Sequence, residues 1–215
     1  MFDQRFHIPL CITEAFRLGS VNLAQYNTLI LPGGSYPELS KSQIENIRRW
    51  TENGGTLIAV RNAASWTTAN EIGKTIFKKN PEADTLVQTG YADKNKTASL
   101  NEIGGAIFNA EMDISHPLCY GYKEKSLPVF KTGNMVAESL NIKYAEPVKF
   151  SDDPYLSGFV SDNNLNRIKN APVVSVQNIG RGKLITLHES MTFRGFWLGT
   201  NKIFMNSVFF GRTIR

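Results

Sequence analysis

The sequence has only two cysteines and three histidines in 215 residues, and neither type forms a metal-binding pattern. Cys11 and Cys119 give neither a disulfide framework nor a CxxC pair, so we expect both to be buried free thiols. There is no HExxH motif, and no HxxE motif with a distant histidine. A catalytic zinc site is therefore not expected in this chain, and no cofactor is expected in the domain.

The absence of other motifs excludes further classes of function. The chain contains neither GxGxxG nor GxxxxGK[ST], which leaves dinucleotide and P-loop roles unsupported. No apolar run approaches the roughly 18 residues that cross a bilayer, and the first 16 residues do not form a signal peptide. The net charge of +5 is mild and its cations are scattered, which favours a solvated surface over a nucleic-acid interface.

The first third of the chain alternates strand-like and helix-like segments. Ser40 and Gln43 have the spacing of a capping box, and a helix that starts there meets a stop at residues 53–55. A second helix over residues 65–79 would point Trp66, Ala69, Ile72 and Ile76 inward. Strand, helix and strand joined by short connections predict βαβ units and a parallel sheet. The expected strands are residues 7–13, 28–32 and 56–60, and the expected first helix is residues 40–53.

The later part of the chain has a different pattern. Residues 80–102 are polar with little periodicity, which indicates a loop or insertion, and regular structure is expected to resume at residues 104–113. Two β-rich runs at residues 172–178 and 182–189 flank a glycine-containing turn and predict a hairpin. A helix over residues 200–210, with Thr200 as N-cap, closes the chain.

A nucleophile is missing from the turn where one would be expected. An elbow between strand and helix presents a serine or cysteine, but the turn after residues 56–60 reads Arg61-Asn62-Ala63. Asn62 can neither form a nucleophilic anion nor be activated by a base. Ser65 lies further along, where serine ordinarily caps a helix, and Cys119 lies outside any strand–turn–helix context.

The histidines offer few acid–base partners. His116 with Glu111 and Asp113 would make at most a weak metal site, and a turn histidine bonded to the backbone is the favoured interpretation. His188 is followed directly by Glu189, and neighbours on an extended strand point to opposite faces. A strand-end histidine with its hydrogen bonds satisfied is therefore favoured over a catalytic pair.

LILPGG at residues 29–34, a helix, GGTLIAV at residues 54–60 and a small-residue turn together resemble the class I glutamine amidotransferase-like fold. The resemblance implies that the turn at Gly33 and Gly34 supplies oxyanion-hole amides and binds ligand. It places the family's cysteine at Asn62, give or take one residue, and neither Arg61 nor Ala63 restores it. Active members use a His-x-Glu pair as base and orienter, whereas here the two residues are adjacent.

A more specific resemblance covers most of the chain from residue 26 onward. Residues 180–211, with HPLCYGY, LPVF and LSGFVSDNNLNRI, are similar to the amidotransferase-like domain attached C-terminally to large bacterial zinc carboxypeptidases. This implies that residues 1–215 are a single domain of a longer, periplasmic or secreted zinc metallocarboxypeptidase. The zinc and the peptidase domain that would be its partner would lie upstream.

The expected architecture is a flavodoxin-like three-layer α/β sandwich, with a mostly parallel sheet and an antiparallel C-terminal hairpin. A βαβ unit takes about 30 residues, and only 27 residues precede Thr28. We therefore expect the first strand and helix of the fold to be missing here or to lie upstream. In the flavodoxin-like strand order, the missing strand would lie between the strands at residues 7–13 and 28–32.

Three functions remain open from the sequence. The leading one is a non-catalytic accessory domain that binds or positions substrate, or packs on the peptidase domain, with Gly33, Gly34, Asn62 and His188 as ligand-binding candidates. The second is a working hydrolase with a relocated nucleophile, Cys119 or Ser65, and His188 or His116 as its base. The third is a carbohydrate-binding module that uses aromatic side chains near the loops: Tyr36, Trp66 and Tyr91.

Overall fold

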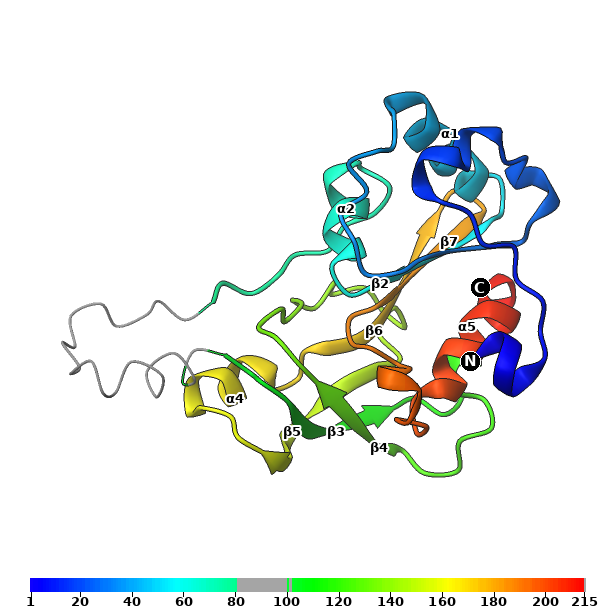
Figure 1. The fold of residues 1–215 in the computed structure, drawn as a ribbon. Coiled ribbons are helices and arrows are strands. Elements are labelled where there is room, and N and C mark those ends of the chain that lie inside the picture. Colours follow the sequence, from blue (N-terminus) through cyan, green and yellow to red (C-terminus); the bar gives the residue numbers. More distant parts are fainter. Residues whose placement is uncertain (81–99, 101, 215) are drawn as a thin grey trace.

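The structure, a computed structural model, describes residues 1–80, 100 and 102–214, so most of the polar stretch at 80–102 lies outside the described residues. The described residues form one seven-stranded mixed sheet with the order β1-β2-β7-β6-β5-β3-β4 (Figure 1). The expected α/β class is confirmed. The strands are β1 (Thr28–Leu31), β2 (Thr56–Val60), β3 (Ala106–Met112), β4 (Ser126–Lys131), β5 (Val148–Gly158), β6 (Pro172–Ile179) and β7 (Gly182–Leu187).

The parallel part of the sheet is the part with βαβ connections. β1, β2 and β7 are parallel, and Thr28, Thr56 and Lys183 lie side by side near the N-terminal ends of these strands. Helix α1 (Lys41–Glu52) connects β1 to β2 and begins with the expected capping box between Ser40 and Gln43. This reciprocal bonding satisfies two backbone donors that a helix N-terminus otherwise leaves free.

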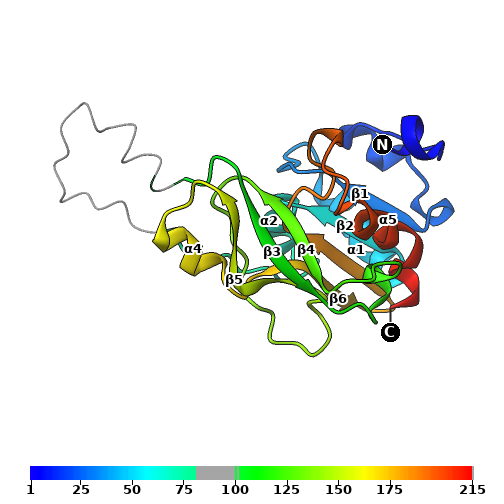
Figure 2. The same cartoon turned by 90° about the horizontal axis from the view of Figure 1, so that it is seen from below.

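The rest of the sheet is antiparallel, from the β7–β6 pair through β5 and β3 to β4 (Figure 2). The predicted hairpin is confirmed, with Ile179 paired to Gly182 and Gly180 at φ 57° in the turn. The antiparallel region extends well beyond this hairpin. Regular structure resumes, as expected, within residues 104–113, where β3 lies between β4 and the irregular, bulged β5.

Helices cover both faces of the parallel part, as in a three-layer sandwich. Leu57 and Leu184 are buried in a core with Ile47 of α1, on the face that α1 and α2 (Ala63–Ala69) cover. Ile58 and Ile185 face the opposite core with Ile203 of α5 (Asn201–Phe210). Alternating directions along each strand thus serve two cores. A short helix, α4 (Asp162–Ile168), packs on β5.

The expected strand at residues 7–13 is wrong. Residues 1–27 contain no strand; their regular structure is short helical turns at Phe2–Phe6, Ala15–Ser20 and Leu23–Gln25. His7 has φ 50°, and Pro9 has no N–H for a strand ladder. Phe2 instead anchors this segment on α5, with its ring 5.5 Å from that of Phe204. Cys11, expected to be buried, is exposed on the same segment.

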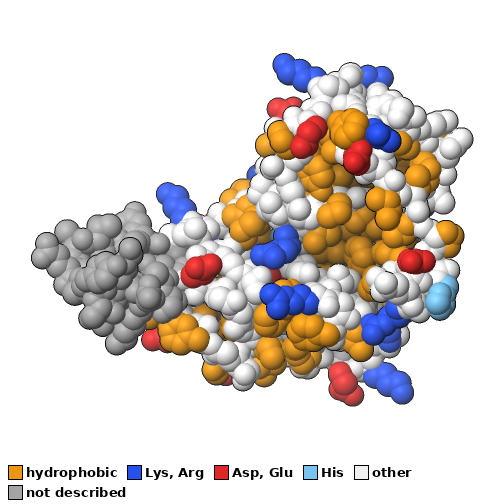
Figure 3. Space-filling model, viewed as in Figure 1, with side chains coloured by type: hydrophobic (Ala, Val, Ile, Leu, Met, Phe, Trp, Pro, Cys, Tyr) orange, Lys and Arg blue, Asp and Glu red, His pale blue; other side chains and the backbone are white. Residues whose placement is uncertain are grey.

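With no strand from residues 1–27, β1 has β2 as its strand partner and forms one edge of the sheet. Its sequence, TLIL, is the apolar run of a strand covered on both sides, yet Thr28, Leu29 and Ile30 are only half-buried. Figure 3 shows a hollow lined by hydrophobic side chains on the face that carries α5 and the N-terminal segment. A further strand and helix outside residues 1–215 stay a prediction.

The second predicted helix is shorter than expected. It ends at Ala69 instead of residue 79, because the Asn70 side chain donates to the Trp66 carbonyl and Glu71 turns to φ 56°. Trp66 and Ile72 are buried as predicted, whereas Ala69 and Ile76 are exposed. No helix in the described part of the chain is both long and apolar enough to cross a membrane.

Candidate functional site

The turn between β2 and α2 has the conformation of a nucleophile elbow. Arg61 has φ 52°, a left-handed conformation that costs a non-glycine residue free energy and is held by its surroundings. Its N–H donates to the Leu187 carbonyl at 2.7 Å, and its carbonyl accepts from the Ala64 N–H at 3.0 Å. The strained residue that an elbow uses for its nucleophile is therefore an arginine in this protein.

Asn62 follows the strained residue and stands at the N-cap of α2. Its side chain makes no capping hydrogen bond and is exposed. A Cβ added to Gly33 would lie 2.9 Å from Asn62 Oδ1, so the LPGG turn and the elbow are in direct contact. Only a glycine at residue 33 leaves room for the Asn62 amide at this point.

The LPGG turn is held by an aromatic side chain. The Tyr36 hydroxyl donates to the Pro32 carbonyl, and its ring lies beside Gly34 and 5.6 Å from the ring of Trp66. Burial raises the pKa of Tyr36 to about 12, which keeps the phenol protonated as a donor. Tyr36 and Trp66 are thus engaged in packing, whereas Tyr91 lies outside the described residues.

Arg61 reaches away from the elbow toward β4. Its Nη2 donates to the Thr132 carbonyl at 3.1 Å. Ala63, next in the turn, is fully buried, and Ser65 is exposed in the first turn of α2, where its N–H donates to the Asn62 carbonyl. None of these residues supplies a nucleophile at the elbow tip.

His188 is a buried side chain at the end of β7. Its Nε2 is 3.0 Å from Ser175 Oγ on β6, and the Phe77 ring covers it at 6.4 Å between centroids. Its Nδ1 is buried with no hydrogen-bond partner among the described residues. Burial, reinforced by the Lys131 charge, lowers the pKa of His188 to about 3, so the imidazole is neutral at pH 7. We expected both ring nitrogens of His188 to be hydrogen-bonded, but among the described residues only Nε2 has a partner.

Glu189 belongs to a buried ion pair. Lys131 Nζ lies 2.6 Å from Glu189 Oε1, and it also donates to the Met135 carbonyl at 2.6 Å. Both charged side chains are almost fully buried. Burial raises the pKa of Glu189, while the charges of Lys131 and Arg61 oppose the rise. Histidine and glutamate therefore bond to different partners, Ser175 and Lys131, and not to each other.

His116 and Cys119 lie in a separate turn that packs against α5. His116 Nδ1 accepts from the Leu118 N–H at 3.2 Å, the backbone-bonded arrangement that the sequence favoured. The Cys119 thiol is buried against the Pro147 carbonyl, and burial raises the pKa of Cys119 to about 12. A thiol that stays protonated at neutral pH is a poor nucleophile.

The weak metal set does not form a cluster. Asp113 accepts hydrogen bonds from the Ser115 backbone and hydroxyl, and these bonds lower the pKa of its carboxyl. In the part of the chain that the structure describes, no group of three or more His, Cys, Asp or Glu side chains is placed to hold a metal ion.

Two residues of this region were missed in the sequence. Lys131 ends β4, where Leu127, Val129 and Lys131 alternate onto one buried face. That period of two was a usable signal, because it points a lysine into the core, where it needs a partner. Ser175 gave no comparable signal, since its role depends on the β6–β7 register that places it near His188.

The fold and the site define a class. A sheet with parallel β1, β2 and β7, helices on both faces, an LPGG turn and an elbow in contact with it together make an α/β fold of the kind seen in ThuA-like proteins and in PurLQS. The strained residue of this elbow is Arg61, at φ 52°.

Solved structures with this fold include a putative ThuA-like protein from Bacteroides uniformis, 16% identical over 92% of this chain and 74% of that chain, with a TM-score of 0.56. A cytoplasmic protein from Salmonella typhimurium is 12% identical over 96% and 82%, with a TM-score of 0.54. PurLQS from Thermotoga maritima is 13% identical over 86% and 80%, with a TM-score of 0.50. At these identities the likeness shows the fold alone. No family model and no curated protein matches the chain.

Proposed function

We propose that this chain is a non-catalytic amidotransferase-like domain that binds or positions a ligand and does not hydrolyse one. The observation that carries the proposal is the identity of the strained elbow residue, Arg61 at φ 52°. A guanidinium is permanently protonated and has no lone pair free for attack. The scaffold that would display a nucleophile is retained, and its tip residue cannot act as one.

The supporting groups are engaged in structure. A base with a pKa of about 3 is a weak proton acceptor at neutral pH, and His188 Nε2 already contacts Ser175. Glu189, which would orient such a base, is paired with Lys131 at 2.6 Å. Among the described residues around the elbow, this supports the lack of three functions that acyl transfer requires: nucleophile, tuned base and orienter.

What remains at the elbow suits binding. The Asn62 amide is exposed, makes no capping bond and touches the LPGG turn at Gly33. An amide offers both donors and an acceptor to a neutral polar group. We therefore propose that a ligand bound at the elbow contacts the Asn62 side chain and the backbone of Gly33 and Gly34.

We further propose that the domain is accessory to a bacterial zinc carboxypeptidase exported from the cytoplasm. The support is the resemblance of residues 180–211, which here form the β7 strand, the loop after it and α5. In this proposal the zinc belongs to the upstream peptidase domain. The present domain either holds the substrate peptide or packs on the peptidase.

Activity of the purified chain tests the first proposal. We expect no glutaminase, esterase or peptidase turnover from the wild type, from the Cys11→Ser/Cys119→Ser double variant or from His188→Ala. Turnover that survives the double cysteine substitution and is lost in His188→Ala would overturn the non-catalytic assignment. Turnover that is lost when Cys119 or Ser65 is substituted would instead establish the hydrolase with a relocated nucleophile. For Cys119, that result would oppose the expectation from its buried, protonated thiol.

The second proposal is tested by the coding DNA upstream of Met1. A peptidase domain with an HxxE motif in the same reading frame supports the accessory role. A stop codon that separates this chain from any peptidase gene contradicts it, and leaves the non-catalytic assignment untouched.

A further inference from the structure

A cavity lies at the N-terminal ends of the parallel strands β2 and β7, whereas the elbow lies at the C-terminal end of β2. The cavity has a volume of about 250 Å³ and adjoins the first residues of β2 and β7, where Thr56 and Lys183 are paired in register. The elbow follows the last residues of β2, so the two sites are at opposite ends of the same strand. The lining residues are Asn53, Gly54, Thr56, Arg181, Gly182, Lys183 and Arg212.

Three of the residues around this cavity are cations, and none of the lining residues is acidic. Each cation bonds to a neutral amide oxygen: Arg181 to Asn53 at 3.3 Å, Arg212 to Asn27 at 2.9 Å and Lys183 to Asn178. Within the described residues, no carboxylate forms an ion pair with any of the three. The nearby Glu52 accepts from the Arg181 N–H through its backbone carbonyl.

Two buried polar groups line the cavity without the partners that buried polar groups normally have. Lys183 is only 9% exposed and has no anionic partner, so burial lowers the pKa of its ammonium. Thr56 is 1% exposed, and its hydroxyl has no hydrogen-bond partner among the described residues. Buried charges are normally paired and buried hydroxyls normally bonded. An anion held in this cavity would supply the missing countercharge.

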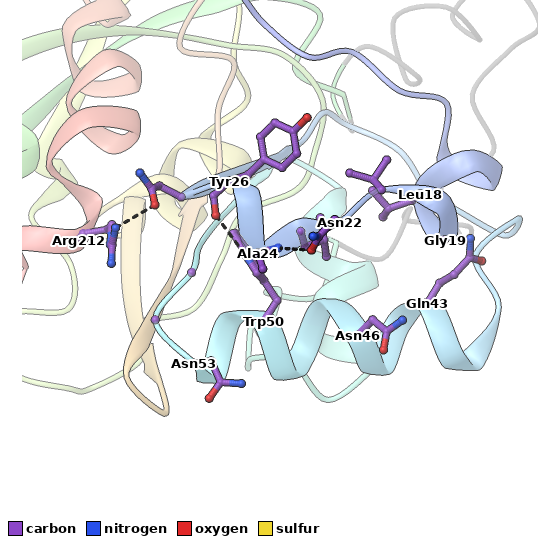
Figure 4. A pocket seen from close by; sticks show the side chains of 15 residues that line it. Leu18, Gly19, Asn22, Ala24, Tyr26, Gln43, Asn46, Trp50, Asn53 and Arg212 are labelled. Atoms are coloured by element: carbon purple, nitrogen blue, oxygen red, sulfur yellow. Dashed lines mark hydrogen bonds between the residues drawn. The ribbon is translucent and has the colours of Figure 1, made fainter.

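A polar groove of about 500 Å³ continues from this cavity and shares Asn53, Gly54 and Arg212 with it. One stripe of α1 and its C-cap lines the groove at helical spacing: Gln43, Asn46, Trp50 and Asn53 (Figure 4). Segment 18–27 forms the other wall, and the Trp50 indole N–H is bonded to the Tyr26 carbonyl. Neutral amides beside an indole suit a body that carries hydroxyl groups.

We propose that this edge of the sheet binds a small phosphate monoester with a hydroxyl-bearing body. The phosphate lies among Arg181, Lys183 and Arg212, and the body extends along Asn53, Asn46 and Trp50. Two guanidinium forks and an ammonium match a doubly charged phosphate better than a singly charged carboxylate. This site is separate from the elbow and does not depend on the function proposed there.

Ribose 5-phosphate, ribose and inorganic phosphate are suitable probes for the whole 215-residue chain. Titration calorimetry and amide chemical shifts are expected to show ribose 5-phosphate binding more tightly than phosphate, with no binding of ribose. Arg212→Gln and Arg181→Gln, at exposed positions, should each weaken both anions by about tenfold or more, the loss expected for a charge-assisted hydrogen bond. Asn46→Ala should weaken ribose 5-phosphate alone.

Two control variants make the test specific. Lys143→Gln removes an exposed positive charge from a loop that does not line the cavity, and Asn62→Ala alters the elbow; both should bind like the wild type. Absence of binding at tens of millimolar phosphate, equal loss in Lys143→Gln and Arg212→Gln, or stronger binding of a single-stranded oligonucleotide would each overturn the proposal. Lys183→Gln adds a third site variant, and its circular dichroism shows whether a loss reflects unfolding.

Discussion

Lys131 Nζ lies 2.6 Å from Glu189 Oε1 in a pair almost wholly excluded from solvent, so a cation from β4 holds the carboxylate that follows β7. This pair joins the end of β4 to the end of β7, elements separated in the sheet by β3, β5 and β6. It ties the antiparallel half of the sheet to the elbow region, where Arg61 also reaches Thr132 next to Lys131. The charges of Lys131 and Glu189, which could have adjusted the pKa of a catalytic base, therefore stabilise the tertiary structure instead.

Breaking this pair from one side should be costly. Lys131→Met leaves the Glu189 carboxylate buried without its cation, and we expect the free energy of unfolding in urea to fall by about 3–5 kcal/mol. The double variant Lys131→Met/Glu189→Leu should recover most of that loss, because no charge is left buried. Arg17→Met, which breaks the exposed Arg17–Glu14 pair, should cost under about 1 kcal/mol. A single-variant loss as small as that of Arg17→Met would contradict this account.

The β6–β7 hairpin meets the end of α1 so closely that it requires glycine at residue 182. A Cβ there would lie 1.9 Å from the Thr51 carbonyl oxygen and 2.4 Å from that of Gly55. Both obstacles are backbone atoms, so Gly182→Ala should cost about 3 kcal/mol or more in thermal or urea unfolding. At Gly104 nothing lies within 4 Å of an added Cβ, and Gly104→Ala should stay within about 1 kcal/mol of wild type. Equal effects of the two substitutions would show that the hairpin is not packed in this way.

The two cysteines should differ sharply in reactivity. Cys11 is exposed, whereas Cys119 is buried and burial raises its pKa to about 12. Titration of the native chain with a thiol-specific disulfide reagent should therefore modify Cys11 alone at neutral pH, and both thiols once the chain is unfolded. Cys11→Ser should remove the native signal. Rapid native modification of Cys119 would revive it as a candidate nucleophile.

Stability should decline in mild acid because of His188. Its folded pKa of about 3 is far below the unfolded value near 6.5, so protons bind preferentially to the unfolded chain. The associated stability is complete above pH 6.5 and is lost as the pH falls toward 3. Between pH 7 and pH 5 this one group should cost about 2 kcal/mol.

Substitution at His188 isolates this effect. His188→Gln should reduce the difference in unfolding free energy between pH 7 and pH 5 by that amount. His116, whose pKa burial also lowers, retains its own smaller contribution in every variant. A pH dependence that persists unaltered in His188→Gln would refute the assignment.

Local signals in the sequence predicted the parallel core well. The Ser40–Gln43 capping box, the apolar runs of β1 and β2 and the glycine turn of the β6–β7 hairpin each depend on neighbours within a few residues. The role of the LPGG turn came from the resemblance alone and stays a prediction, although the turn lies against Asn62 at Gly33.

Features that depend on the folded chain could not be predicted from the sequence. The segment at residues 7–13 has strand-like composition, but nothing in the described residues pairs with it. The second helix ends at Ala69 because the Asn70 side chain donates to the Trp66 carbonyl and Glu71 is left-handed, and helical periodicity reveals neither feature. The alternation in β4 could have indicated that Lys131 is buried, but its partner Glu189 lies 58 residues away, beyond a strand that is not a neighbour of β4 in the sheet. Only the folded chain could pair the two residues.

The most direct test of the central claim is the protonation of His188, followed by nuclear magnetic resonance of its imidazole from pH 8 to pH 4. We predict that the ring stays neutral throughout this range, with Nε2 bonded to Ser175 and its signals perturbed by Ser175→Ala. A His188 pKa between 6 and 8 would show a base poised for catalysis and would contradict the non-catalytic account.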